Sequence, residues 1–331
     1  MKKLVTEFDN NIDYNKYFKA LEVCFVDIET TGLSSNYNSI YLIGLLYYNK
    51  SKDLWTLVQL FADNISQESQ ILTDFINIIK NFDSIITYNG DTFDIPFINK
   101  RLEYLDINYK ISKELSFDLY KVVKENRYYL NLENLKLKTL EKSIGIFRDD
   151  IYSGKECIQF YKDYVDTNNE EYKNRVLKHN YDDLYYMINI LEILDIIDQK
   201  KTFFIDYKDY KITLKITSID TVGDIFILKG YYVEDLYMKL IHYDNNYSII
   251  IDEKKQFELS LEYSTGLVSA EEKAIYVDKN KIALSNHIID STNYNVSANV
   301  ILLKIEKKFS IDNIKAIVSD LITKSLIANL Y

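Results

Sequence analysis

The strongest constraint on the fold is a change of hydrophobic patterning near residue 200. Before it, short apolar runs typical of buried strands alternate with segments of helical period. After it, short alternating strands follow one another until a helical pattern begins at Ser310. We therefore predict a first domain over residues 1–200 and a smaller, β-rich accessory domain over residues 201–331 that ends in a helix.

The first domain is predicted to be an α/β domain with a mixed sheet flanked by helices. Apolar runs of strand length occupy residues 22–28, 39–48, 54–61, 84–89 and 115–119. Segments of helical period occupy residues 67–81, 94–105 and 178–199, with further helices between 134 and 176. Three strands in succession, followed by alternating helices and strands, favour a mixed sheet between helices.

Composition excludes several classes of protein. With 8 glycines and 1 proline, the chain is neither collagen-like nor proline-rich. The longest apolar run, Tyr41–Tyr48, is too short to cross a bilayer, and the N-terminal MKKLVTEFDNN lacks the apolar stretch of a signal peptide. Cys24 and Cys157 lie far apart, with neither a metal-ligand spacing nor a disulfide framework. We therefore expect a cytoplasmic protein without a membrane partner.

The net charge of −10 argues against a protein that coats nucleic acid nonspecifically. It is compatible with an enzyme whose clustered acids form the active site.

The first candidate site is the segment DIETTG (27–32), at the end of an apolar strand. Residues two apart in a strand point to the same face, so the carboxylates of Asp27 and Glu29 lie side by side. Burying this pair is costly unless a cation neutralises it, and carboxylate oxygens suit Mg²⁺ or Mn²⁺. Taken alone, the segment would be explained by a strand that simply ends in solvated acids.

Two further acidic motifs follow. YNGDTFD (88–94) places a glycine turn after a strand and Asp94 at the start of a helix, where an aspartate is often only a cap. HNYDD (179–183) places His179 and Asp183 on one helical face, because they are four residues apart. By itself, this motif would be explained by a polar first turn with a surface histidine.

Together the three motifs resemble the DEDD superfamily of ribonuclease H-like 3′–5′ exonucleases. YNGDTFD is similar to the proofreading-domain pattern of polymerases, down to the Phe before the Asp. The intervening SFDLYKVV (116–123), LKLKTLEKSIGI (135–146) and RDDIYSGKE (148–156) are similar to bacterial YprB-type ribonuclease H-like proteins. The resemblance covers about residues 20–200.

The resemblance implies a metal-dependent hydrolase that acts at the 3′ end of single-stranded DNA or RNA by a two-metal mechanism. Two Mg²⁺ or Mn²⁺ ions would be held by Asp27, Glu29, Asp94 and Asp183, with Asp27 bridging both ions. His179 lies four residues before the last acid, which is the spacing of the tyrosine-type members. It would either act as the general base or only orient the attacking water.

The resemblance also implies residues that bind substrate. Thr30, Thr31 and Gly32 would lie at the terminal nucleotide, and Asn89 and Phe93 would shape the same pocket. Two alternatives stay open at this point. The same acids could serve a structure-selective endonuclease, or the chain could be a catalytically inactive nucleic-acid-binding module.

Overall fold

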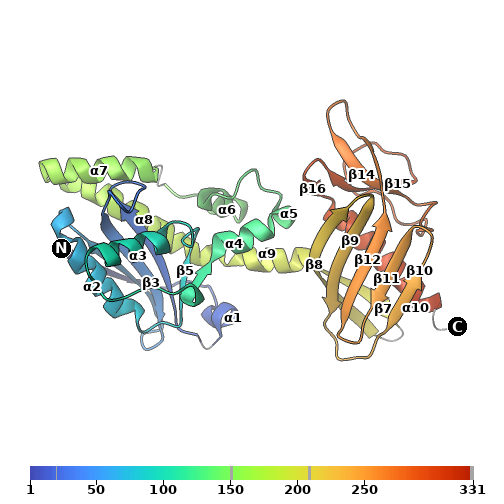
Figure 1. Cartoon of the computed structure of the whole chain (residues 1–331), viewed down its shortest axis with the longest axis horizontal. Coiled ribbons are helices and arrows are strands. Elements are labelled where there is room, and N and C mark those ends of the chain that lie inside the picture. The colour runs from blue at the N-terminus through green and yellow to red at the C-terminus, as the bar shows by residue number, and fades with distance from the viewer. Residues whose placement is uncertain (20, 150–151, 208–209, 329–331) are drawn as a thin grey trace. The chain divides into compact units, whose positions relative to one another are not determined.

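The computed structural model describes residues 1–19, 21–149, 152–207 and 210–328 (Figure 1). The chain divides into two compact units. Unit 1 comprises Met1–Arg127 and Leu132–Ile193, and unit 2 comprises Tyr128–Asn131 and Leu194–Tyr331. Each unit contains a hydrophobic core of its own.

Unit 1 is built on a six-stranded mixed sheet of order β1-β4-β3-β2-β5-β6. The strands are β1 Lys2–Phe8, β2 Val23–Thr30, β3 Ile40–Asn49, β4 Leu54–Phe61, β5 Ser84–Thr87 and β6 Ser116–Asp118. The first four pair antiparallel, whereas β5 and β6 join β2 in parallel. The predicted mixed sheet is confirmed. The edge strand β1 was not predicted, because its side chains are almost all exposed and form no apolar run.

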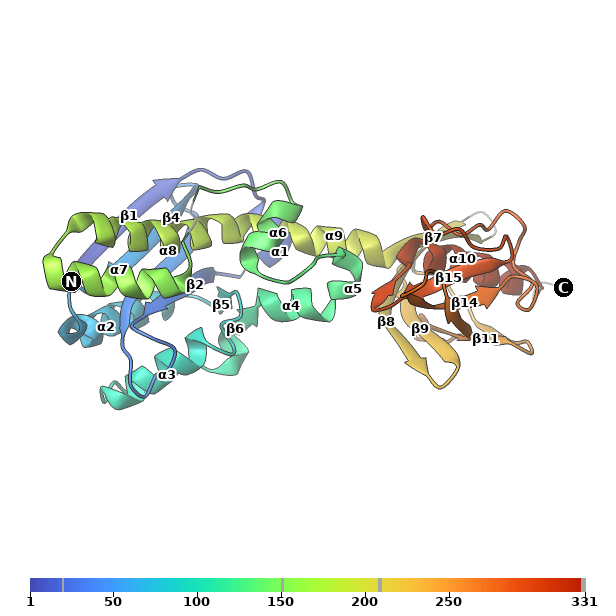
Figure 2. The same ribbon diagram turned by 90° about the horizontal axis from the view of Figure 1, so that it is seen from above.

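Helices cover both faces of this sheet. The helices before the second sheet are α1 Tyr14–Phe18, α2 Glu68–Ile79, α3 Asp94–Tyr104, α4 Leu119–Glu125, α5 Arg127–Leu130, α6 Leu137–Ser143, α7 Gly154–Thr167, α8 Glu170–Ile190 and α9 Glu192–Lys201, with 3₁₀ turns η1 Ile65–Gln67 and η2 Lys113–Leu115. Helices α7 and α8 pack together over one face, and α2 and α3 lie on the opposite face (Figures 1 and 2).

The long helix predicted over residues 178–199 begins earlier and is interrupted. The side chain of Asn169 accepts a hydrogen bond from the backbone N–H of Glu171 at 2.9 Å, which starts α8 at Glu170. Leu191 separates α8 from α9. The predicted start was wrong because the first two turns of α8 are rich in charged residues and carry little apolar pattern.

Unit 2 contains two antiparallel sheets and a C-terminal helix. The six-stranded sheet has the order β10-β11-β12-β9-β8-β7, and the four-stranded sheet has the order β13-β14-β15-β16. The elements are β7 Thr202–Tyr207, β8 Tyr210–Val222, β9 Ile225–Tyr232, β10 Leu240–Tyr243, β11 Tyr247–Ile251, β12 Gln256–Glu262, β13 Ser264–Leu267, β14 Lys273–Asp278, β15 Val300–Ile305, β16 Lys308–Phe309 and α10 Ile311–Ala328.

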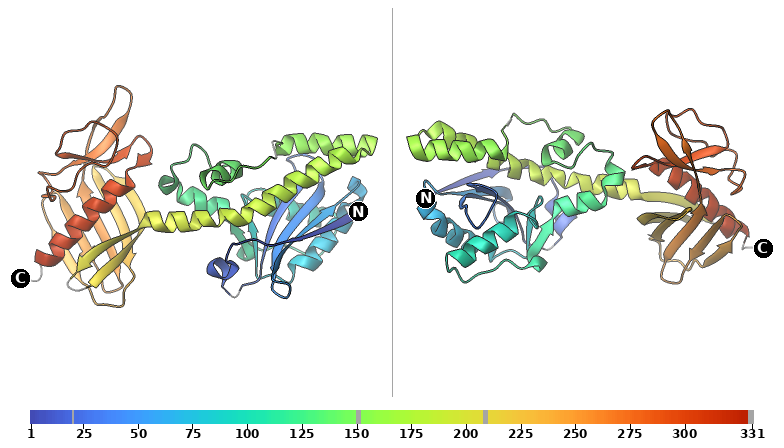
Figure 3. Two further views of the ribbon diagram at one scale, coloured as in Figure 1. Left: turned by 180° about the vertical axis from the view of Figure 1, so that it is seen from behind. Right: turned by 45° about the horizontal axis from the view of Figure 1, so that its top comes forward.

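Helix α10 lies across one face of the six-stranded sheet (Figure 3). Ile314, Ile317 and Leu321 of the helix share a buried core with Leu214 and Leu228 of the sheet. This arrangement confirms the expected β-rich region with a C-terminal helix. In the described residues of the whole chain, no helix combines the length and the apolar character needed to span a bilayer.

Candidate active site

The first two acids lie on β2 beside a β-bulge. Asp27 and Glu29 both point toward α8, as their spacing predicts. The pairing of β2 with β3 shifts register between Glu29 and Thr30, which leaves Tyr41 as the extra residue on β3. Bulges of this kind bend a strand and change the direction of the neighbouring side chains. The bulge therefore helps to set the direction in which the Glu29 side chain points.

Helix α8 brings Asn180 against Asp27. The Asn180 amide donates to Oδ2 of Asp27 at 2.8 Å, and Nε2 of Gln59 donates to the side-chain oxygen of Asn180 at 2.9 Å. Asn180 is fully buried. The close approach of α8 to β3 depends on Gly44, because a Cβ at that position would lie 2.4 Å from Oδ1 of Asn180. The Asp27 carboxylate is therefore oriented by a buried amide.

His179 and Asp183 lie on the same side of α8. Nε2 of His179 is 3.8 Å from Oε1 of Glu29 and 3.8 Å from Oδ2 of Asp183. The histidine is only 6% exposed, so a surface histidine does not explain the motif. The guanidinium of Arg148 pairs with Asp183 and, at 2.9 Å, with the buried carboxylate of Glu141. Asp183 is thus held between a cation and an imidazole.

Asp94 reaches the same place from the start of α3. Its Oδ1 accepts a hydrogen bond from the backbone N–H of Ile28 at 3.2 Å, which ties the carboxylate to β2. The preceding turn is held by the buried Asp118, which accepts hydrogen bonds from the backbone N–H groups of Asn89 at 2.8 Å and Asp91 at 3.2 Å. The turn thereby positions the Asp94 side chain next to β2.

Each carboxylate of the cluster makes the charged form of its neighbours less favourable. Burial, followed by the charges of Asp183 and Asp94, raises the pKa of Asp27 well above its ordinary value. Burial is the main cause that raises the pKa of Asp94 to about 7, with the charges of Asp118 and Asp183 acting in the same direction and the hydrogen bond from Ile28 opposing them. Hard divalent cations bind oxygen ligands and offset the repulsion between clustered carboxylates. These residues therefore fit Mg²⁺ or Mn²⁺.

The expected substrate-binding residues on the β2–β3 loop stabilise that loop. Oγ1 of Thr30 donates to the carbonyl of Gly32 at 2.8 Å, and Oγ1 of Thr31 accepts from the backbone N–H of Ser39 at 3.0 Å. These contacts place the loop directly after the strand that carries the acids. A role in binding substrate stays a prediction.

The two expected residues of the YNGDTFD turn also have local contacts. Asn89 adopts a positive φ of 68°, and its side-chain oxygen accepts a hydrogen bond from the Thr92 hydroxyl at 2.7 Å. Phe93 is half-buried, with its ring 5.5 Å from that of Phe97. The structure thus brings the four acids and His179 together, whereas these side chains shape the surrounding turns.

Sequence reasoning missed several residues of this site. Asn180 lies inside HNYDD and Arg148 opens RDDIYSGKE, so the motifs contained a signal that their spacing alone did not interpret. Cys157 lies on α7, and one ligand atom each of Glu29, Cys157 and His179 lie within 4.8 Å of one another. Cys157 has no metal-ligand spacing along the chain, and only the fold places it beside Glu29 and His179. Three different elements supply these ligands, so no spacing along the chain could reveal them.

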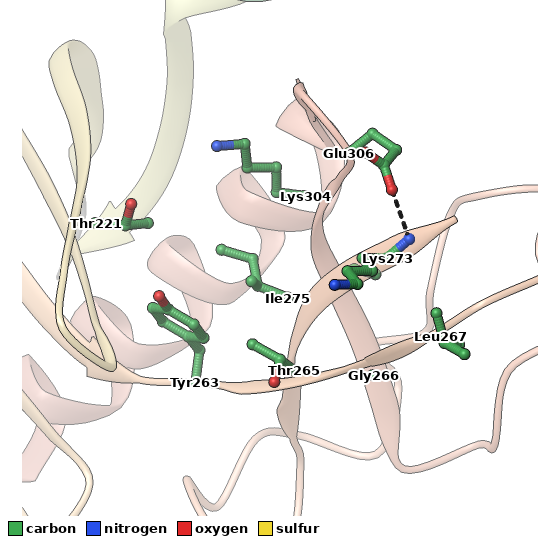
Figure 4. A pocket seen from close by; sticks show the side chains of 10 residues that line it. Thr221, Tyr263, Thr265, Gly266, Leu267, Lys273, Ile275, Lys304 and Glu306 are labelled. Atoms are coloured by element: carbon green, nitrogen blue, oxygen red, sulfur yellow. Dashed lines mark hydrogen bonds between the residues drawn. The ribbon is translucent and has the colours of Figure 1, made fainter. Parts of the chain in front are cut away.

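Unit 2 holds a pocket of different character, with a volume of about 590 Å³ (Figure 4). Tyr263, Lys273 and Lys304 are among its lining residues, and the backbone N–H of Lys273 donates to Glu306 at 2.7 Å. Its lining mixes lysine, hydroxyl and apolar side chains, in contrast to the acid-rich site of unit 1.

Comparison with models of protein families places most of unit 1 in a known family. A model of the RNase_H superfamily matches residues 24–195, which is more than half of the 331 residues. Among curated proteins, a DNA polymerase of Thermococcus kodakarensis is 27% identical over 123 residues, covering 30% of this chain and 7% of that protein. A PolC-type DNA polymerase III of Ureaplasma parvum is 32% identical over 114 residues, covering 28% of this chain and 8% of that protein. The chain thus spans far less than two thirds of these relatives.

Two solved structures align with part of the chain. The family B DNA polymerase of Pyrobaculum calidifontis aligns with a TM-score of 0.42 and 17% identity, covering 53% of this chain and 24% of that chain. E. coli Exonuclease I in complex with a dA16 oligonucleotide aligns with a TM-score of 0.28 and 13% identity, covering 63% of this chain and 55% of that chain.

Proposed function

The chain belongs to the RNase H superfamily, and on this premise we propose that it is a metal-dependent nuclease acting as a 3′–5′ exonuclease on single-stranded nucleic acid. The observation that supports the proposal is the convergence of Asp27, Glu29, Asp94 and Asp183 from three elements around His179. The likeness of the motifs to the proofreading pattern of polymerases favours attack from the 3′ end. The proposal also includes an accessory domain over residues 201–331 and a cytoplasmic location.

In this proposal the four acids hold two divalent cations, either Mg²⁺ or Mn²⁺. When bound, such ions supply an activated water and stabilise charge on the leaving oxygen. The chain's own contribution is orientation. The Asn180 amide holds the Asp27 carboxylate at 2.8 Å, and the Ile28 N–H holds that of Asp94 at 3.2 Å. Catalytic groups that are fixed before the reaction lose no further freedom in the transition state.

His179 is the proposed proton acceptor. Its Nε2 lies 3.8 Å from both Glu29 and Asp183, so the imidazole stands beside the acids, where it would accept a proton from the attacking water. Arg148 stays paired with Asp183 and limits the movement of that carboxylate. Thr30, Thr31, Gly32, Asn89 and Phe93 are proposed to contact the terminal nucleotide.

The test uses 5′-labelled single-stranded DNA and RNA of one sequence, incubated with Mg²⁺, Mn²⁺ or EDTA. We expect a ladder that shortens from the 3′ end, requires the metal, and is absent for Asp27→Asn and Asp183→Asn. The matched control is Asp182→Asn, because Asp182 neighbours the site in sequence but pairs with Lys178 at 2.7 Å. The control should cleave at the wild-type rate.

The outcomes separate the alternatives. Internal cleavage that a blocked 3′ end does not prevent would favour the structure-selective endonuclease. Binding without cleavage by any metal would favour the inactive binding module. Wild-type activity of Asp27→Asn would contradict the proposed site.

A further inference from the structure

Three buried side chains with different donor atoms meet beside the acids. Glu29 comes from β2, Cys157 from α7 and His179 from α8. Their exposures are 7%, 0% and 6%, and one ligand atom of each lies within 4.8 Å of the others. The group therefore offers an oxygen, a sulfur and a nitrogen within the span of one metal ion.

The position of Cys157 follows from how α7 begins. Ser153 and Glu156 form a capping box that starts the helix at Gly154, so Cys157 falls in the first turn. The residues that follow on this face are buried tyrosines with partners of their own. Tyr161 donates to the carbonyl of Ala62 at 3.1 Å. A buried cysteine usually packs as a small apolar side chain, whereas this thiol lies against a carboxylate and an imidazole.

Tyr41 gives a second, independent sign that the group takes a ligand. The side chain is fully buried, and among the described residues its hydroxyl has no hydrogen-bond partner. Burial, followed by the charge of Glu29, raises the pKa of this hydroxyl well above its ordinary value. Buried hydroxyls are nearly always hydrogen-bonded, so one that is not, at the bulge beside Glu29, has the capacity to bond a water molecule carried by an ion at these donors.

The donor set selects the class of ion. Thiolate and imidazole favour Zn²⁺ and similar borderline-soft cations, whereas Mg²⁺ prefers oxygen ligands alone. We propose that Glu29, Cys157 and His179 form a site for a thiophilic divalent cation of the Zn²⁺ class. On binding, the thiol releases its proton to solvent and the sulfur becomes a thiolate ligand.

Such a site would regulate the nuclease, a consequence that rests on the proposed function. Glu29 and His179 belong to both arrangements, because Glu29 would help to hold Mg²⁺ and His179 would accept the proton. A Zn²⁺ ion on Glu29, Cys157 and His179 removes both groups from catalysis. Zn²⁺ therefore inhibits cleavage supported by Mg²⁺, and Cys157 gives the inhibition its preference for thiophilic ions.

Binding is tested on the full chain with Co²⁺ as the probe, because thiolate ligation to Co²⁺ produces a near-ultraviolet charge-transfer band. The folded wild type should develop this band, and Cys157→Ser should lose it. The matched control is Cys24→Ser, since Cys24 is an equally buried thiol on β2 outside the group of three. Fluorescence of the single tryptophan, Trp55, verifies that each variant is folded.

Absence of the band in folded wild type would overturn the proposal. So would a band that persists in Cys157→Ser, or in Cys157→Ala if the serine variant fails to fold.

A second measurement separates this proposal from the nuclease itself. Zn²⁺ is titrated into cleavage supported by Mg²⁺, with each protein compared to its own uninhibited rate. The Zn²⁺ concentration for half inhibition should rise about tenfold or more in Cys157→Ser and stay unchanged in Cys24→Ser. A cobalt band without Mg²⁺-dependent cleavage would contradict the proposed function and support the cation site. Cleavage without a band would support the function and overturn the site.

Discussion

Replacing Gly44 by alanine should damage both stability and activity, because this glycine sets the distance between β3 and α8. An alanine Cβ would lie 2.4 Å from Oδ1 of Asn180 and 2.4 Å from Cδ1 of Leu184, whereas ordinary contact begins at 3.4 Å. Both neighbours are fully buried, so α8 itself must retreat by about 1 Å to relieve the clash. Overpacking of this kind costs about 1–3 kcal/mol of unfolding free energy.

The same retreat should disturb the site. It stretches the 2.8 Å hydrogen bond from Asn180 to Asp27 beyond hydrogen-bonding range. Groups that orient a metal ligand typically contribute about 10–100-fold to affinity or activity, and we expect a loss of that order in the cleavage rate. Gly154→Ala is the matched control, because an added Cβ there meets no atom within 4 Å. It should change stability by less than about 1 kcal/mol, in the stabilising direction.

The assay is denaturant unfolding followed by the fluorescence of Trp55, which lies on β4 and so reports on unit 1. Cleavage rates are measured on the same preparations. If Gly44→Ala unfolds at the denaturant midpoint of the wild type and cleaves at its rate, the contact between α8 and β3 does not position the site, and the reasoning is refuted.

Three further predictions concern charge and orientation. Burial raises the pKa of Asp94 to about 7 from an ordinary value of about 3.9, so the protonated form stabilises the fold. That stability is complete below about pH 4 and lost as the pH rises through about 7. In EDTA, the unfolding free energy of the wild type should therefore fall across this window, and that of Asp94→Asn should fall less, as measured by tryptophan fluorescence. Arg148→Gln should lower the unfolding free energy by about 3–5 kcal/mol, because it leaves the buried Glu141 without its cation, and an unchanged denaturant midpoint would contradict this. Asn180→Ala should slow cleavage about 10–100-fold by releasing Asp27, and a wild-type rate would show that the amide does not orient the acid.

Much of the fold was predictable because its signals are local. The buried strands β2, β3 and β4 are continuous apolar runs, and α2 and α3 have an apolar face of helical period. The elements that were missed have weak local signals. Strand β1 is almost wholly exposed and pairs with β4, which lies fifty residues away along the chain. Its place in the sheet depends on that long-range pairing.

The candidate site divides in the same way. Asp27, Glu29, Asp94 and Asp183 stand out in the sequence because each acid follows an apolar strand or lies on a helix face, where its side-chain direction follows from local geometry. Their partners do not stand out. Asn180 meets Asp27 only because residue 44 is a glycine, and the register shift at Tyr41 has no signal in the alternation of β3.

The sequence by itself therefore determined the buried strands, the helix faces and the four candidate acids, since these depend on residues close together in the chain. The tertiary structure alone decided which buried groups surround the acids. Arg148 reaches Asp183 from a loop, and Cys157 reaches Glu29 and His179 from another helix. Contacts of this kind arise from packing between distant segments, and packing distances are set by shape complementarity across the core, which hydrophobic periodicity does not encode.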